Sequence, residues 1–125
     1  MITSPVMAEK CDGPSGGTGT KVVGVDGHSY CRSNIKMNWW SAFAWCEGIG
    51  KTLVSLEDCN GIDGSVPASD VACPNFDHKG SGDVWTSSVP RNDGAYRITL
   101  SSGAVVSCTP SVGCGRHSTT YALCK

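Results

Sequence analysis

The sequence predicts a small α+β domain held together by disulfide bonds, and three observations support this fold class. Eight cysteines in 125 residues form an even and dense set, which favours a disulfide framework in an oxidising compartment. Residues 37–51 have the apolar spacing of a helix. Short β-rich runs separated by turn residues fill the second half of the chain. Helices early and strands late are the order of an α+β arrangement.

The size and charge of the chain exclude several classes of protein. A length of 125 residues fits one domain. The formal net charge is -1 and no polybasic run is present, so we expect no nucleic-acid partner. No apolar run approaches 18 residues, so we expect no membrane span. Residues 1–10 lack the basic start and apolar middle of a signal peptide. Either a targeting segment was removed, or the sequence is an excised domain.

The first elements are an arm and a hairpin. Residues 1–19 are rich in Gly, Pro, Ser and Thr, which is typical of a flexible linker or arm. The domain proper is therefore predicted to span residues 20–125. Asp26 and Gly27 separate a Val-rich run from a run that contains Tyr30. Both residue types tolerate positive φ, so this pair predicts a β-hairpin.

The helix follows the hairpin. Asn38 is a good N-cap because its side chain accepts hydrogen bonds from first-turn amides. The apolar stripe of one helical face comprises Trp39, Ala42, Phe43, Cys46 and Ile49. Gly48 and Gly50 end the helix. Trp40 and Trp45 lie off the stripe, so we expect the helix to be covered on more than one side.

A second helix and a set of strands complete the expected order. Residues 51–54 are predicted to be extended, and Ser55 to Asp58 resembles a capping box that opens a second, brief helix. Residues 59–83 lack periodicity and need a tether, which Cys59 and Cys73 are placed to provide. The predicted strands are residues 84–88, 95–100, 104–109 and 119–125, forming an antiparallel meander.

The cysteine spacing favours disulfides over metal. Zinc sites prefer short paired spacings such as C-x-x-C, whereas the closest pair here, Cys108 and Cys114, has five residues between its members. None of the three histidines, His28, His78 and His117, forms an H-x-x-x-H pair. We therefore expect no bound metal and no cofactor.

Motifs at both ends of the domain resemble those of the C-type lectin-like domain. The matching residues are 27–30, 39–42, Cys46, 50–55 and 121–124, which follow the family's signature around its first helix and its last core strand. The runs MNWWSA, VWTSS, LSSG and YALC are similar to a bacterial subgroup of type IV pilin-like and other surface proteins. The resemblance covers roughly residues 27 to 125 and is weakest in the middle.

This resemblance implies a specific architecture. The early helices are expected to pack on a twisted antiparallel sheet stapled by disulfides. One bridge is expected between the first helix and the last strand, here Cys46–Cys124, and another within the late strands and their loop, here Cys108–Cys114. The remaining cysteines then pair as Cys11–Cys31 and Cys59–Cys73. Spacing alone leaves 105 connectivities open.

The sequence does not support calcium binding or catalysis. The family's sugar-binding tripeptides E-P-N and Q-P-D are absent, and in the nearest run, residues 90–93, Arg91 adds positive charge. An acidic group is better explained as solvated or capping residues; it comprises Glu57, Asp58, Asn60 and Asp63. Every cysteine has an expected partner and no G-x-S-x-G elbow is present. We therefore expect no enzyme.

The loops between the late strands form the expected recognition face, because the lectin-like fold uses these loops for binding. They span residues 90–94 and 110–118. The candidate ligand-binding residues, suited to hydrogen bonding, are Arg91, Asn92, Asp93, Arg116 and His117. The expected function is that of an exported bacterial cell-surface or pilus-associated adhesion domain binding a glycan or protein. Alternatives are the structural head of a pilin-like subunit, contacting other pilus subunits, and a diversified receptor-type lectin-like domain.

Overall fold

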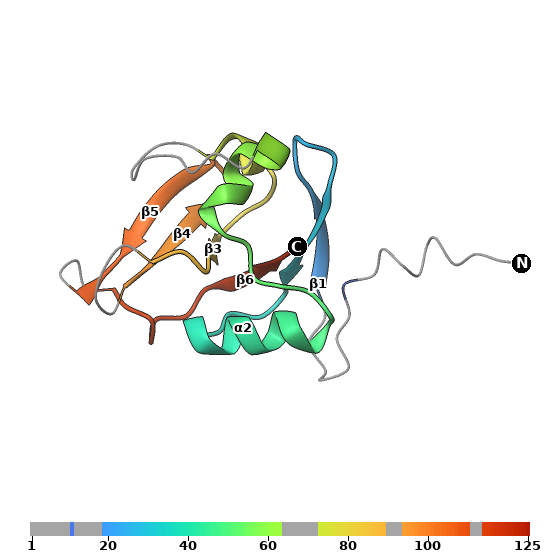
Figure 1. The fold of residues 1–125 in the computed structure, drawn as a ribbon. Helices are drawn as coiled ribbons and strands as arrows, with labels where there is room; N and C mark the ends of the chain where they lie inside the picture. The colour runs from blue at the N-terminus through green and yellow to red at the C-terminus, as the bar shows by residue number, and fades with distance from the viewer. Residues whose placement is uncertain (1–10, 12–18, 64–72, 90–93, 111–113) are drawn as a thin grey trace, which may run out of the picture.

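A computed structural model describes Cys11 and residues 19–63, 73–89, 94–110 and 114–125, with the side chains of 60–63 excepted. It has an α+β architecture in which one α-helix lies on a six-stranded mixed sheet (Figure 1). The described elements are β1 (Gly19–Val23), β2 (Ser29–Ser33), α2 (Trp39–Gly48), the 3-10 helices η1 (Leu56–Asp63) and η2 (Pro74–Phe76), β3 (Asp83–Trp85), β4 (Ala95–Thr99), β5 (Ala104–Cys108) and β6 (Tyr121–Cys124).

The order of the strands corrects the predicted meander. The sheet runs β1-β2-β6-β3-β4-β5, so β3, β4 and β5 form a meander but β6 leaves it and enters the middle of the sheet. It pairs antiparallel with β2 and parallel with β3, which makes the sheet mixed and not antiparallel. The reason is burial: Ala122, Leu123 and Cys124 are fully buried. A strand that is apolar on both faces needs cover on both, which an edge position does not give.

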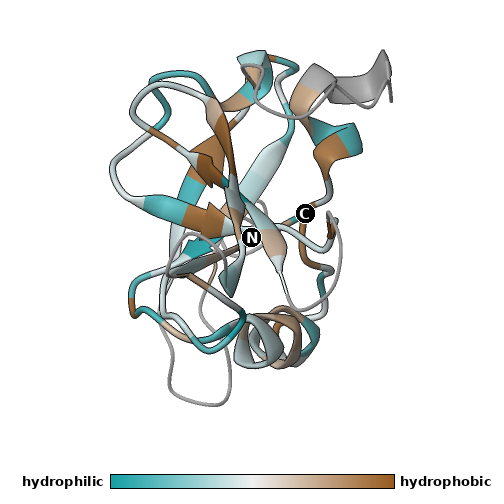
Figure 2. Cartoon of the chain, turned by 90° about the vertical axis from the view of Figure 1, so that its left-hand side faces the viewer, coloured by the Kyte–Doolittle hydropathy of each residue, from teal (hydrophilic) through white to brown (hydrophobic). Residues whose placement is uncertain are grey.

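Two apolar clusters lie on the two faces of the sheet. Alternate residues of β6 enter different clusters, because successive side chains of a strand point to opposite faces. Ala122 and Cys124 join the cluster that includes Ala42, Trp45 and other residues near α2. Leu123 joins the second cluster, with residues of η1 and η2. Figure 1 shows α2 and η1 on opposite sides of the strands, and in Figure 2 hydrophobic segments concentrate in the strands.

The local signals read from the hairpin and the helix ends are confirmed. β1 and β2 pair antiparallel around a turn in which Gly27 has φ 85°. The Asn38 side chain accepts a hydrogen bond from the Ser41 amide at 2.9 Å. The helix ends at Gly48, and Gly50 adopts φ 78°, the left-handed conformation that glycine tolerates.

The prediction that α2 is covered on several sides is wrong at one residue. Trp45, although off the apolar stripe, is 7% exposed and belongs to the core. Trp40 is 47% exposed, so its face of the helix is left open to solvent. Trp39 is half-buried, and its indole Nε1 donates to the Thr86 carbonyl at 2.9 Å. The helix therefore buries the side that carries Trp45 in the core and leaves the side that carries Trp40 exposed to solvent.

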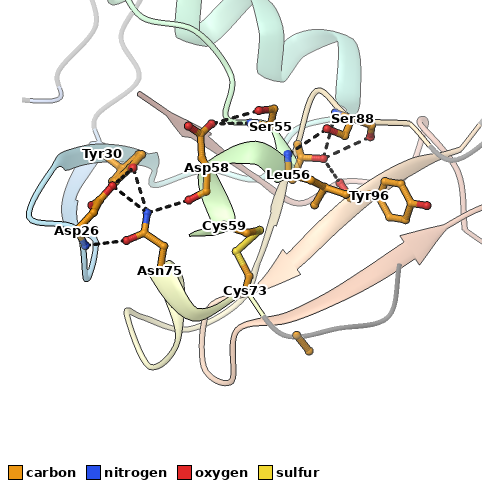
Figure 3. The surroundings of a disulfide bond; sticks show 12 residues. Asp26, Tyr30, Ser55, Leu56, Asp58, Cys59, Cys73, Asn75, Ser88 and Tyr96 are labelled. Carbon is orange, nitrogen blue, oxygen red and sulfur yellow. Dashed lines mark hydrogen bonds between the residues drawn. A yellow bond between two sulfur atoms is a disulfide. The ribbon is translucent and has the colours of Figure 1, made fainter. Parts of the chain in front are cut away.

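The segment after α2 follows the prediction closely. Leu53 bridges Cys124, and η1 begins at Leu56. The Asp58 carboxylate accepts a hydrogen bond from the Ser55 amide at 2.9 Å, which is one half of the predicted capping box. The Cys59–Cys73 disulfide then ties η1 to the segment that holds η2, as Figure 3 shows. The predicted tether of the long irregular segment is thus confirmed.

Three of the four expected disulfides are present, namely Cys46–Cys124, Cys59–Cys73 and Cys108–Cys114. The fourth expected pair, Cys11 with Cys31, is not formed, and this is a correction. The two residues do meet in the core, but the Cys31 thiol donates to the Cys11 backbone carbonyl at 3.4 Å. Cys11 and Gly19, both within the predicted arm, belong to the folded body.

No helix in the described ranges is long and apolar enough to cross a membrane. The three disulfides favour folding in an oxidising compartment, since such bonds are rare where thiols are kept reduced.

Removing a disulfide is expected to lower the free energy of unfolding, and the loss should be larger for the disulfide that closes the longer loop. The Cys46–Cys124 bond spans 78 residues and the Cys108–Cys114 bond spans 6. Chain entropy predicts losses in the free energy of unfolding of about 4 kcal/mol for Cys46→Ala/Cys124→Ala and about 2 kcal/mol for Cys108→Ala/Cys114→Ala. Urea unfolding followed by circular dichroism measures both. A larger loss from the second pair would contradict the assignment of the long bridge as the principal staple.

Candidate functional site

The loop that precedes β6 lies against the start of α2, and this junction holds two of the five predicted ligand-binding residues. Arg116 and His117 lie in residues 114–118, which pass beside the first turn of the helix (Figure 1). Arg91, Asn92 and Asp93 lie outside the described residues. Gly94, the next described residue, contacts Arg116. The structure thus places Gly94, the last residue of the predicted loop 90–94, beside the predicted loop 110–118.

Arg116 holds this junction together. Its backbone carbonyl accepts a hydrogen bond from the Trp39 amide at 3.0 Å, which satisfies one of the helix's first N–H groups. Its Nε donates to the Gly94 carbonyl at 2.9 Å, and its guanidinium carbon lies 4.3 Å from the centroid of the Trp39 ring. These contacts join three chain segments, so Arg116 has an architectural role that sequence reasoning did not predict.

His117 and Trp40 form the exposed part of the junction. The centroids of their rings are 4.9 Å apart at an interplanar angle of 54°. Both side chains are exposed, as predicted for His117 but not for Trp40. The Trp40 ring also contacts Trp39 in a T-shaped arrangement, with centroids 5.9 Å apart. Trp40 is therefore held from two sides by rings yet keeps a large apolar surface in water.

A pocket of about 540 Å³ opens at these residues. Its lining consists of Trp40, Pro110 and residues 114–118. The pocket is of the size usual for small-molecule sites, which combine apolar surface with a few polar groups. Its polar groups are the His117 imidazole and the Ser118 hydroxyl, both of which donate and accept hydrogen bonds, with the guanidinium of Arg116 beside them.

The pocket is preorganised by short-range bonds. The Cys108–Cys114 disulfide closes the loop at its start, and Cys114 itself lines the pocket. The Cys114 amide donates to the Thr109 carbonyl at 3.0 Å, and the Ser118 amide donates to the Gly115 carbonyl at 3.0 Å. These bonds hold the described lining residues in place before a ligand enters, which lowers the entropic cost of binding.

Sequence reasoning missed the central residue of the site. Trp40 was expected to be covered by other parts of the chain, because its place off the apolar stripe indicated a helix packed on more than one side. Its position in the first helical turn, off the stripe formed with Ala42 and Cys46, is the signal that could have marked it. Trp45 carries the same signal and is buried, so position alone does not separate the two.

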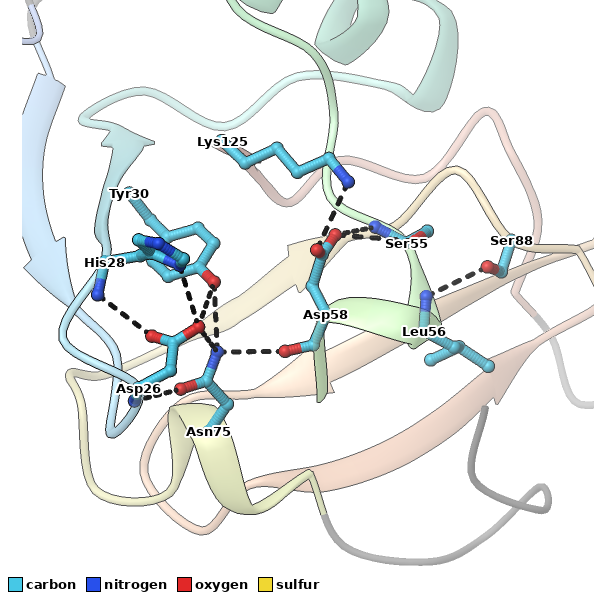
Figure 4. A network of polar contacts seen from close by, with 9 residues as sticks. All are labelled: Asp26, His28, Tyr30, Ser55, Leu56, Asp58, Asn75, Ser88 and Lys125. Carbon is cyan, nitrogen blue, oxygen red and sulfur yellow. Dashed lines mark hydrogen bonds and ion pairs between the residues drawn. The ribbon is translucent and has the colours of Figure 1, made fainter. Parts of the chain in front are cut away.

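A second polar group, centred on Asp26, has a structural role (Figure 4). Asp26 Oδ2 accepts from the Tyr30 hydroxyl at 3.0 Å and lies 3.2 Å from His28 Nδ1. The Asn75 side-chain amide donates to the Asp58 carbonyl at 2.9 Å, and its Oδ1 accepts from the Asp26 amide at 2.9 Å. The network ties the β1–β2 hairpin to η1 and η2.

This network shifts two pKa values. Burial alone would raise the pKa of Asp26, but the hydrogen bonds donated by the His28 amide and the Tyr30 hydroxyl outweigh it, so that the pKa lies below its ordinary value of 3.8. Burial, together with the hydrogen bond to Asp26, raises the pKa of Tyr30 to about 12. Asp26 therefore stays ionised and Tyr30 stays neutral across the physiological range, which suits fixed acceptor and donor roles.

The acidic residues near η1 have capping and pairing roles where the structure describes them. The Asp58 carboxylate accepts the hydrogen bond from the Ser55 amide at the start of η1, and it forms an ion pair with Lys125 Nζ at 3.2 Å. Glu57 is exposed. No cluster of three or more His, Cys, Asp or Glu side chains that could hold a metal ion occurs within the described part of the chain.

Comparisons with protein-family models, with curated proteins and with solved structures find no match to this chain.

Replacing Arg116 is expected to loosen the junction. Arg116→Ala removes the Nε hydrogen bond and the stacking on Trp39, so we expect a loss of about 1–2 kcal/mol in the free energy of unfolding and faster exchange of the Ser118 amide. Urea unfolding and hydrogen exchange by NMR measure these effects. Arg116→Lys is the matched control: it keeps the charge without the planar guanidinium, so full rescue by lysine would contradict an architectural role.

Asp26→Asn is expected to destabilise the protein at neutral pH and to have less effect in acid. The folded-state pKa of Asp26 is lowered, so its contribution to stability is present above pH 3.8 and is lost as the pH falls through the folded value. We expect a loss of about 1–3 kcal/mol at pH 7, shrinking towards pH 3. Urea unfolding at both pH values tests this, with Glu57→Gln as the surface control. Equal losses at pH 7 and pH 3 would disprove the linkage.

Proposed function

We propose that this chain is a non-enzymatic recognition domain of an exported bacterial surface or pilus-associated protein, with a C-type lectin-like fold, and that it binds a glycan or a protein on another cell or surface. The observation that carries the proposal is the rigid pocket at the start of α2, in which a half-exposed tryptophan, Trp40, is surrounded by hydrogen-bonding groups. Exposed aromatic side chains held in rigid pockets are common anchors in recognition sites.

The disulfide pattern supports the lectin-like part of the proposal. The resemblance implies a bridge from the first helix to the last strand, and α2 is tied to β6 by Cys46–Cys124. It also implies a bridge at the late strands, where Cys108 of β5 pairs with Cys114 in the following loop. The mixed sheet and the lack of any structural match leave the fold family a proposal.

The surroundings of the described histidines support a non-enzymatic role. His28 contacts Asp26, His78 contacts Asp77, and His117 contacts the Trp40 ring. Nucleophilic catalysis needs a hydroxyl or thiol beside the histidine, which a carboxylate then orients, and none of these three contacts is with a hydroxyl or thiol. The site that the structure does present is suited to holding a ligand and not to activating one.

The proposal predicts cell binding that depends on Trp40. The chain, biotinylated at its N-terminus and tetramerised on fluorescent streptavidin, is incubated with intact mammalian and bacterial cells and measured by flow cytometry. We expect staining of at least one cell type, and Trp40→Ala should reduce it at least about tenfold, as loss of an anchoring aromatic does.

The control for this experiment is Val25→Ala. Val25 is 69% exposed in the β1–β2 turn, outside the residues that line the pocket. This variant should stain as the parent does. Staining that survives Trp40→Ala would place recognition elsewhere on the molecule. No staining of any cell by the folded parent would contradict the proposal and favour the alternative, a structural head of a pilin-like subunit.

A further inference from the structure

The Trp40 pocket combines features that together narrow the chemistry of its ligand. Its described lining combines the exposed Trp40 side chain, the polar side chains of His117 and Ser118, and Cys114, which is held by a disulfide. A matching ligand needs a flat apolar face of about the size of an indole and hydroxyl-like groups around its edge.

We propose that the Trp40 pocket binds a single pyranose ring of a glycan, stacked on the exposed indole surface, without a metal ion. This inference rests on the proposed recognition function and specifies the ligand class of the same site. The C–H groups on the face of a pyranose are polarised by the neighbouring oxygens. They are therefore attracted to the electron-rich face of an aromatic ring, which carries the negative part of its quadrupole.

The rim of the pocket fits the edge of a sugar ring. Sugar hydroxyls both donate and accept hydrogen bonds, and so do the Ser118 hydroxyl and, through its two ring nitrogens, the His117 imidazole. His117 lies within ring contact of Trp40, so a ring stacked on the indole has hydrogen-bonding partners at its side. No acidic side chain is among the pocket-lining residues that the structure describes.

Other flat ligands fit less well. Nucleobases also stack on aromatic rings, but proteins that use this mode add a basic groove for the phosphates. This chain has a net charge of -1, and the guanidinium of Arg116 is already stacked on Trp39. A cationic ligand is disfavoured because Arg116, itself a cation, lines the pocket.

The pocket does not have the donors for recognition through a cation. Hard cations need several converging oxygen ligands. The pocket's described side chains offer the Ser118 hydroxyl and the His117 nitrogens, while Cys114 is in a disulfide. The ring must therefore be held by stacking and direct hydrogen bonds, so binding should persist in a chelator.

Titration of the whole chain with methyl glycopyranosides tests the inference. Methyl glucoside, methyl galactoside and methyl N-acetylglucosaminide are the probes, and glucitol is the control ligand, since it carries hydroxyls without a flat ring. The readouts are tryptophan fluorescence and the indole N–H signals in NMR. Of the four tryptophans, Trp40 alone is exposed, so its signals report on the pocket.

We expect at least one glycoside to bind with a Kd of roughly 1 mM to 10 mM, as befits a ligand of this size, and to shift the Trp40 indole signal. Glucitol should produce no shift, and EDTA should change nothing. Trp40→Ala should weaken binding at least about tenfold, Trp40→Phe less, and Ser118→Ala about threefold. Val25→Ala should bind as the parent does. Near-UV circular dichroism of each variant checks that the fold is retained.

Four results would overturn the inference: no shift with any glycoside, an equal shift with glucitol, loss of binding in EDTA, or unchanged binding in both Trp40 variants. The first result also separates the two proposals. If cells are stained through Trp40 but no glycoside binds or competes, the recognition function stands and the ligand is a protein surface. If neither occurs, both proposals fail.

Discussion

The fold depends on placing β6 in the middle of the sheet and fixing it there. Three of its four residues are fully buried, and their side chains belong to both apolar clusters. The strand reaches this position only after the chain has completed β3, β4 and β5, so its pairings with β2 and β3 are long-range and costly to form. The Cys46–Cys124 bond offsets part of this cost by joining the strand to α2 across 78 residues.

The site is a consequence of this crossing. To reach β6 from the edge strand β5, the chain must return across the sheet, and the described residues 114–120 pass the start of α2 on the way. Thr120 and Met37 bridge each other there, with N–H···O distances of 2.7 and 3.0 Å. Arg116 then joins the returning chain to its neighbours. Its carbonyl and its guanidinium group contact Trp39 of the helix, and its Nε donates to the Gly94 carbonyl. The topology that buries β6 thus also creates the pocket.

Local features were predictable from the sequence and long-range ones were not. The Asp26-Gly27 turn and the Asn38 cap depend on the conformational preferences of neighbouring residues, which a sequence displays directly. The parallel pairing of β3 with β6 depends on competition among strands for buried positions, which spacing does not encode. The Cys46–Cys124 and Cys108–Cys114 disulfides followed from a family resemblance. The other two pairings were the cysteines that remained: Cys59–Cys73, which is also placed to tether an irregular segment, is present, and Cys11–Cys31 is not.

The candidate site was half predicted for a related reason. The loop after β5 was predicted to be a recognition face, and His117 of this loop lines the pocket. The main apolar surface of the site comes instead from Trp40 of α2, which lies much earlier in the chain, and the sequence does not distinguish Trp40 from the other tryptophans of that helix. What distinguishes Trp40 from Trp45 is the partner that each contacts: Trp45 packs in the core, whereas Trp40 contacts His117 of a polar loop and stays 47% exposed. A domain with so small a core gains stability from every buried indole, so an exposed one that is nevertheless held in place by neighbouring rings favours a binding role over a purely structural one.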